Sequence, residues 1–173
     1  GRLKLDDSVA EILKLKPEGD AKRNRRVTVR QCLQHTGGWD RGDSFDPMFQ
    51  SVRIAAVLKT SPPAGAGDVI RFMQKWPLDF DPGTRYAYSN YGYCLLGRVI
   101  ERVTGESYES YVRERVLEPM GISGMRIGRT RENGRAEGEV RYHVDGEKVG
   151  LSVYAEDLGM RVSRAYGAWH IEA

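Results

Sequence analysis

Apolar residues recur at helical spacing along most of the first 120 positions of the chain. After Asp68, four large apolar side chains follow the i, i+3, i+4, i+7 spacing of a helix with one buried face: Val69, Phe72, Met73 and Trp76. We predict that Asp68 caps this helix and that Pro77 ends it. Similar patterns predict a helix over 52–59 and a more regular one whose apolar stripe runs over 96–103, opposite a charged face.

Two early segments have the spacing of a capping box. In this motif a Ser or Thr and a Glu or Gln three residues later each bond the other's backbone amide. The pairs are Ser8 with Glu11 and Thr28 with Gln31. We predict a short helix after each pair.

The most regular predicted helix has clear signals at both ends. Ser89 or Asn90 is expected to cap its start, because both side chains accept hydrogen bonds from free helix amides. Gly105 is expected to close it, because glycine readily adopts the left-handed conformation found after helices. A further helix is predicted from Ser107 until Pro119 stops it.

The pattern changes in the last third of the chain. Gly, Arg and Glu dominate from 128 to 139, which predicts an exposed loop. Alternating apolar residues over 140–144 and the turn Asp145-Gly146 predict a β-hairpin that returns at Lys148-Val149. The chain is therefore predicted to be α+β, mostly helical with a small β-hairpin.

Composition sets limits on the class of protein. A chain of 173 residues, 40% hydrophobic and 29% charged, suits one globular domain or a large part of one. The 27 Lys and Arg against 24 Asp and Glu leave a charge of +3, too small to indicate nucleic acid. The basic cluster over 22–26 contains no aromatic residue and predicts a solvated loop. No apolar run approaches the roughly 20 residues of a membrane span.

The two cysteines are far apart in the sequence. Cys32 and Cys94 each lie among apolar residues in a predicted helix, and we interpret them as buried free thiols. A disulfide between them stays open, because two cysteines do not make a framework.

The segment that ends in Tyr88-Ser89-Asn90 is the most informative for function. The turn Pro82-Gly83 delivers the chain to the start of the most regular helix, where free amides and the positive end of the helix dipole gather. A phenol placed there can project into a cleft, and an amide offers both a donor and an acceptor. From these three residues alone, a packing Tyr and a capping Asn are the simpler interpretation.

Neighbouring segments change that interpretation. Tyr88-Ser89-Asn90 resembles the Tyr-x-Asn motif of class C β-lactamases and of their relatives, the D-Ala-D-Ala peptidases and many esterases. Further segments that resemble this family keep the family order: Gly1–Asp7, Val27–Gly38, Pro82–Gly83, Tyr91–Gly97, Val103–Tyr108 and Glu118–Ile122. Such an ordered set favours an active-site role over simple packing.

The resemblance implies roles for individual residues. The family nucleophile is the Ser of Ser-x-x-Lys, the Tyr exchanges protons with it, and the Asn orients the substrate. These roles would make Tyr88 catalytic and Asn90 substrate-binding, with a β-lactam, a D-Ala peptide or an ester as substrate. The resemblance implies no metal and no other cofactor. A phenol is a poor base at neutral pH unless ammonium groups stand nearby, so Lys partners are required.

Those partners are not evident in this chain. No Ser is followed three residues later by Lys, and the family places that motif just before the segment matching Gly1–Asp7. His35-Thr36-Gly37 resembles the family's third motif but precedes Tyr88, and we interpret it as a turn. We therefore expect 1–173 to be a partial β-lactamase/transpeptidase-like domain, without its nucleophile helix and C-terminal strands, and inactive by itself.

Three further expectations accompany this one. The alternative to an enzyme is a non-catalytic binding or structural module that retains the helical scaffold. Helices that normally pack on a missing sheet would expose apolar faces, which predicts self-association. Localisation stays open, because many relatives in the family are exported and the chain begins at Gly1 without an initiator Met.

Overall fold

The computed structural model describes residues 3–129, 134–140 and 149–163 of the protein. Among them the α-helices are α1 (Val9–Ile12), α2 (Val29–Leu33), α3 (Ser51–Leu58), α4 (Ala66–Met73), α5 (Asn90–Thr104) and α6 (Tyr108–Val112). The 3-10 helices are η1 (Gly19–Arg26), η2 (Pro47–Phe49), η4 (Glu118–Met120) and η6 (Ala155–Asp157), and η3 (Arg113–Leu117) is a π-helical turn. The mostly helical α+β prediction is confirmed.

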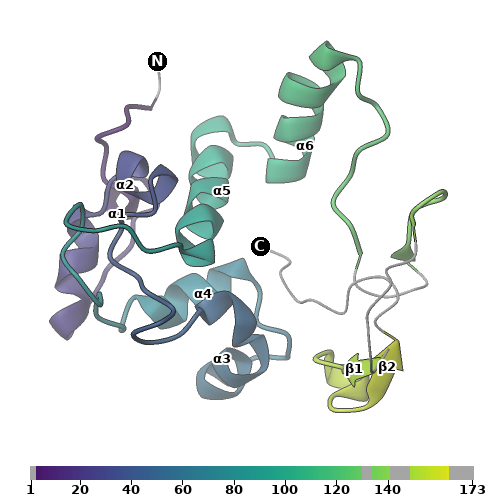
Figure 1. Cartoon of the computed structure of the whole chain (residues 1–173), viewed down its shortest axis with the longest axis horizontal. Coiled ribbons are helices and arrows are strands. Elements are labelled where there is room, and N and C mark those ends of the chain that lie inside the picture. The colour runs from purple at the N-terminus through teal and green to yellow at the C-terminus, as the bar shows by residue number, and fades with distance from the viewer. Residues whose placement is uncertain (1–2, 130–133, 141–148, 164–173) are drawn as a thin grey trace.

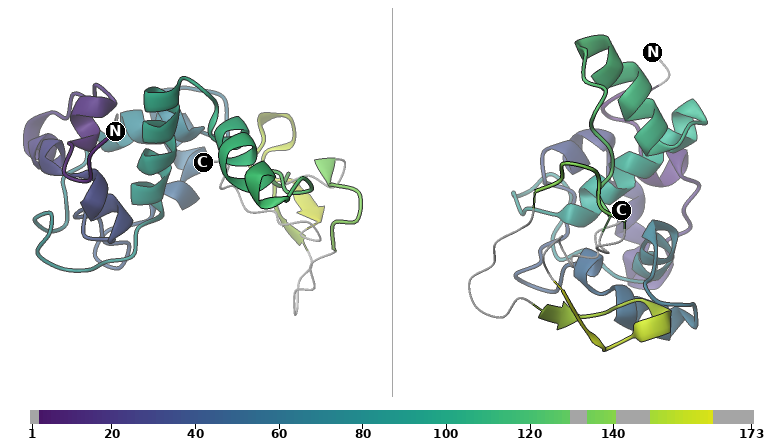
Figure 2. Two further views of the ribbon diagram at one scale, coloured as in Figure 1. Left: turned by 90° about the horizontal axis from the view of Figure 1, so that it is seen from above. Right: turned by 90° about the vertical axis from the view of Figure 1, so that its right-hand side faces the viewer.

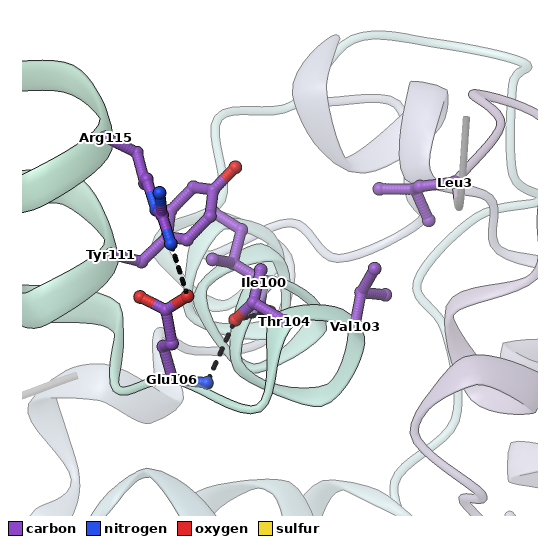
Figure 3. Close-up of a pocket in the computed structure, with 7 residues that line it drawn as sticks. All are labelled: Leu3, Ile100, Val103, Thr104, Glu106, Tyr111 and Arg115. Atoms are coloured by element: carbon purple, nitrogen blue, oxygen red, sulfur yellow. Dashed lines mark hydrogen bonds and ion pairs between the residues drawn. The ribbon is translucent and has the colours of Figure 1, made fainter.

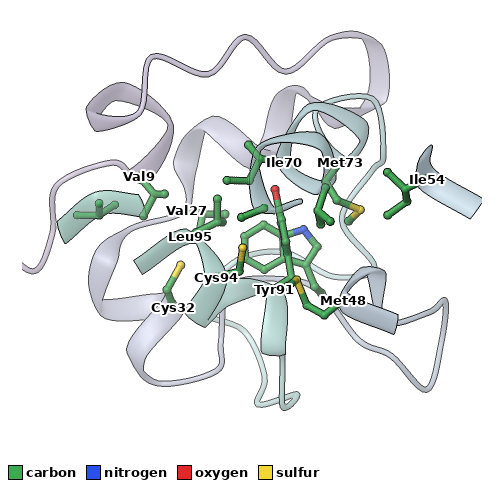
Figure 4. Close-up of a cluster of buried hydrophobic side chains, with 14 of the residues drawn as sticks. Val9, Val27, Cys32, Met48, Ile54, Ile70, Met73, Tyr91, Cys94 and Leu95 are labelled. Carbon is green, nitrogen blue, oxygen red and sulfur yellow. The ribbon is translucent and has the colours of Figure 1, made fainter. Parts of the chain in front are cut away.

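Helix α5 lies at the centre of the packed helices. It contacts α1 and α2 along one side, and α3 packs on α4 next to them (Figure 1). The buried side chains that meet between these helices form one cluster (Figure 4), which includes Val9, Ile54, Met73, Tyr91 and Leu95. Burial of apolar surface in this cluster is the main stabilising contribution to the fold.

Most of the predicted helix ends are confirmed. Thr28 and Gln31 form a complete capping box at the start of α2, and the Ser8 hydroxyl accepts from the Glu11 amide at the start of α1. Ser89 is the N-cap of α5, with its hydroxyl 3.2 Å from the Gly92 amide nitrogen. Gly105 closes α5 in the left-handed conformation, with φ of 80°.

The predicted cap of α4 was wrong. The helix begins at Ala66, and Gly65 in extended conformation is its N-cap, so Asp68 lies inside the first turn. There its carboxylate pairs with Arg71 at 3.1 Å, and a negative charge in a first turn also suits the helix dipole. The helix ends at Met73. Sequence could not separate a cap from a first-turn position, because Asp is favourable in both.

Close backbone contact fixes the geometry of the turn that follows α2. The Asp79 amide donates to the Gly38 carbonyl at 2.8 Å. Gly38 has φ of 111°, and a Cβ atom there would meet the Phe80 carbonyl oxygen at 2.8 Å. Only glycine accommodates both the conformation and the approach. The turn after α2 is thus held against the strand-like segment that leads toward α5.

The chain beyond Gly105 is arranged differently. From α6 it stays helical through η3 and η4, so Pro119 lies within the last helical turn, where its ring is tolerated, and Gly121 closes it. Figures 1 and 2 show α6 beyond the end of α5, away from α3 and α4.

Among the described residues, no helix has the length and hydrophobicity needed to cross a membrane.

The small β component is confirmed. Strand β1 (Val149–Leu151) pairs antiparallel with β2 (Arg161–Ser163), with Gly150 opposite Val162. The predicted return strand coincides with the start of β1. The predicted outgoing strand and its turn fall on 141–148, outside the described residues.

Candidate active site

Tyr88 and Asn90 lie together where the chain enters α5. The Tyr88 hydroxyl donates to the Asn90 side-chain oxygen at 2.9 Å, and the Asn90 side-chain nitrogen donates to the Asp46 carboxylate at 2.7 Å. Asn90 is half-buried, whereas 45% of Tyr88 is exposed. The two predicted site residues are therefore adjacent and hydrogen-bonded, and Tyr88 is accessible to a ligand.

His35 lies against Tyr88 and bonds the backbone of the residue that follows it, although sequence did not indicate His35 as a site residue. Its ring centroid is 4.6 Å from that of Tyr88 and 5.0 Å from that of Tyr93. Its Nδ1 accepts a hydrogen bond from the Ser89 amide at 3.2 Å, so Nδ1 carries no proton in this arrangement. The segment His35-Thr36-Gly37 is a turn after α2, as predicted, and that turn supports the start of α5.

Charged residues join the loop before η2 to the segment before α5. The Arg85 guanidinium bonds the carboxylates of Asp40, at 2.8 Å, and of Asp43. The pKa of Asp40 is lowered, first by the Gly42 amide that bonds its carboxylate and then by Arg85. These groups are exposed or partly exposed, so their individual contributions to stability are small. Their effect is to join the loop to the segment that leads into Tyr88.

Arginine side chains also surround this segment. The guanidinium of Arg41, from the same loop, lies 5.2 Å from the centroid of the Tyr88 ring, within the range of a cation–π contact. Arg23 and Arg26 both bond the Asp81 carboxylate, at 2.9 and 3.1 Å. The basic cluster predicted to be a solvated loop is therefore a 3-10 helix, and it secures the turn that precedes Tyr88.

Neither cysteine is suited to act as a nucleophile at this place. Cys32 and Cys94 are buried free thiols, and burial raises their pKa to about 12 and about 11. Both therefore stay protonated near neutral pH and are unsuited to nucleophilic attack. No group of three or more His, Cys, Asp or Glu side chains among the described residues is placed to hold a metal ion.

A separate cavity of about 520 Å³ lies at the other end of α5 (Figure 3). Ile100, Val103 and Tyr111 supply much of its apolar lining, and Glu106 pairs with Arg115 at 3.5 Å on its rim. A helix of 15 residues is roughly 20 Å long. The cavity is thus remote from Tyr88 and does not belong to the candidate active site.

The chain belongs to the Beta-lactamase family, whose sequence model matches residues 1–165. Penicillin-binding protein 4 of Amycolatopsis lactamdurans is 30% identical over 122 residues, which are 70% of this chain and 29% of that protein. An Escherichia coli protein provisionally named D-alanyl-D-alanine carboxypeptidase is 28% identical over 126 residues, 71% of this chain and 27% of that protein.

A solved structure agrees with this placement. The D-stereospecific amidohydrolase from a Streptomyces species is 26% identical, with a TM-score of 0.59, over 97% of this chain and 48% of that chain. The chain spans less than a third of the length of the curated relatives named above. The family and the largely helical fold suggested by the sequence motifs are therefore confirmed.

Proposed function

We propose that the chain forms part of a serine hydrolase of the β-lactamase/penicillin-binding type, in which Tyr88 moves protons and Asn90 binds the substrate. The observation that carries this proposal is the hydrogen-bonded pair of Tyr88 and Asn90 at the start of α5, accessible from outside and held by His35 and Asp46. Membership of the family supports it.

The proposed reaction is acyl transfer from an amide or an ester. A serine oxygen bonds to the carbonyl carbon and loses its proton, and the bond to the leaving nitrogen or oxygen breaks as that atom gains a proton. Water then adds to the acyl-enzyme and releases the acid. In this proposal the phenol of Tyr88 carries protons in these steps, and the amide of Asn90 holds a carbonyl oxygen of the substrate.

In this proposal the nucleophilic Ser and its Lys come from outside these 173 residues, since no Ser-x-x-Lys occurs within them. The substrate would be a β-lactam, a D-Ala peptide or an ester. The names of two relatives, a penicillin-binding protein and a D-alanyl-D-alanine carboxypeptidase, support the first two classes.

Incubation with a fluorescent penicillin tests this proposal on the chain itself. We expect no covalent adduct on the isolated 173 residues, because the acylated serine would lie elsewhere. A stable adduct, mapped to any serine of this chain, would contradict the proposed division of the site.

A second candidate function is a non-catalytic binding module that retains the helical scaffold. The buried cluster that joins α1 to α5 forms within this chain, and it favours a role for the helices as a scaffold. The coding sequence ahead of Gly1 discriminates between the two: Ser-x-x-Lys there supports the enzyme, and its replacement in the native protein supports the module.

A further inference from the structure

We propose that Asp46 is a positioning residue that fixes the orientation of the Asn90 amide and thereby sets the direction of the Tyr88 hydrogen bond. This inference deepens the proposed function and rests on it, because Tyr88 and Asn90 matter for catalysis only if that function holds. The orientation itself is a property of the folded chain and is measurable without a substrate.

The two carboxylate oxygens of Asp46 have separate partners. One accepts from the Met48 amide at 3.0 Å, which makes Asp46 the N-cap of η2. The other accepts from the Asn90 side-chain nitrogen at 2.7 Å. The first bond fixes the carboxylate on the loop, so that the second oxygen is directed at the start of α5.

The chemistry of an ionised carboxylate then determines the rest of the arrangement. A carboxylate only accepts hydrogen bonds, so Asn90 must turn its NH₂ group toward Asp46. The amide oxygen consequently faces Tyr88, and an amide oxygen also only accepts. The Tyr88 hydroxyl, 2.9 Å from that oxygen, must therefore donate.

This direction has a consequence for the proposed reaction. The Tyr88 proton is held on the side of Asn90, which leaves the lone pairs of the phenol oxygen for a serine hydroxyl. An amide NH₂ has two N–H bonds, and Asp46 takes one of them. The second N–H of Asn90 remains a donor for the carbonyl oxygen of a substrate. Reversal of the Asn90 amide would remove both the direction of the Tyr88 hydrogen bond and the free N–H donor for the substrate.

The decisive variant is Asp46→Asn, which preserves shape and capping ability but gives position 46 an NH₂ group. Its oxygen is still required by the Met48 amide, so its NH₂ group faces Asn90. Asn90 must then reverse and present its oxygen to position 46. The Asn90 NH₂ group then donates to the exposed Tyr88 hydroxyl instead of to a carboxylate.

The measurement is hydrogen exchange of the side-chain amides, observed by NMR on protein labelled with ¹⁵N-asparagine. We expect the bonded Asn90 N–H to exchange about tenfold or more faster in Asp46→Asn than in the wild type, because a bond to a carboxylate is lost. Asn24 is an internal control, since its side-chain nitrogen donates to the carbonyls of Met73 and Trp76 and should not respond.

The double variant Asp46→Asn/Asn90→Asp separates positioning from capping. The new carboxylate at position 90 accepts from both the new amide at position 46 and the Tyr88 hydroxyl, which restores the original direction at Tyr88. We expect slow exchange to reappear at the amide of position 46. If Asp46 only capped η2, the side-chain amide at position 46 would not gain slow exchange in the double variant.

Asp46→Ser provides a second route, because it keeps a capping oxygen but is too short to reach Asn90. Its Asn90 amide should also exchange about tenfold or more faster. Equal Asn90 exchange in the wild type and both single variants, with Asn24 unchanged, would overturn the proposal. That result would leave the acyl-transfer proposal intact, because penicillin labelling tests it separately.

Discussion

The packed helices over 9–104 and the described part of the chain over 108–163 differ sharply in burial. We call them the helical body and the arm. Every buried hydrophobic residue among those described belongs to the helical body. The arm instead exposes several large apolar side chains: Val116, Met120, Met125, Ile127, Val140, Leu151, Leu158 and Met160. The site at Tyr88 therefore rests on a packed core, whereas the arm contributes little to it.

The buried thiols offer the largest expected contrast between the two regions. At pH 8, Cys32, with a pKa of about 12, should react with a thiol reagent roughly a thousandfold more slowly than a free thiol, because so little of it is thiolate. A cysteine introduced by Met125→Cys in the exposed arm should react at the rate of a free thiol. Timed absorbance assays on both proteins check this, and fast reaction of Cys32 would show that the helical body opens readily.

The same shift in pKa predicts a pH dependence of stability. The folded state holds the Cys32 proton more tightly than the unfolded state, whose thiol has a pKa of about 8.5. The stability that the protonated Cys32 thiol gives the folded state is fully present below about pH 8.5 and declines as the pH rises toward 12.

Truncation of apolar side chains should separate the regions further. Leu95 in α5 is 2% exposed, so Leu95→Ala should lower the free energy of unfolding by about 2–5 kcal/mol. Val116 in η3 is 45% exposed, and Val116→Ala should change it by less than about 0.5 kcal/mol. Urea titrations measure both. Similar losses for the two variants would mean that the arm is packed as closely as the helical body.

Replacement of two glycines with positive φ, one in each region, should give a smaller difference in stability. Gly38→Ala combines an unfavourable φ of 111° with a contact to the Phe80 carbonyl oxygen, and should cost about 2–4 kcal/mol. Gly121→Ala has φ of 76° and no heavy atom within 4 Å of its new Cβ, so only about 1 kcal/mol is expected. Thermal unfolding compares them, and an equal loss would remove the role given to the backbone contact at Gly38.

The smallest effect concerns self-association, which we still predict from the apolar surface of the arm. Sedimentation velocity should show a concentration-dependent increase in mass. Replacement of two exposed methionines, Met120→Lys and Met125→Lys, should reduce it, whereas Val57→Lys on the exposed face of α3 should not. A monodisperse monomer at all concentrations would contradict the prediction.

Sequence predicted the helical body better than the arm for a physical reason. Local signals start α2 and both start and end α5, because caps at Thr28 and Ser89 and the left-handed Gly105 act within a few residues. In the arm, no buried stripe fixes the ends of the elements. Pro119 is compatible with a last helical turn as well as with a helix stop. The helical turns therefore continue to Met120, past the helix end predicted at Pro119.

The residues of the candidate site also differ in whether the sequence could predict them. Tyr88 and Asn90 could be found because they form a short motif at a predicted helix start. His35 and Asp46 could not, since they reach the site across 54 and 44 residues of sequence. Their contacts depend on how the turn after α2 and the loop before η2 fold back on α5, which no local pattern encodes.

The rate of acylation tests the central claim most directly. In the protein as its gene encodes it, labelled with a fluorescent penicillin, Tyr88→Phe should acylate about a hundredfold or more slowly than the wild type, because it lacks the hydroxyl that we propose to move protons. Tyr93→Phe is the matched control. Its ring also packs against His35, but its hydroxyl bonds the Leu33 carbonyl, so its rate should stay within about twofold of the wild type. Equal rates for the two variants, or no acylation of the wild type, would contradict the role proposed for Tyr88.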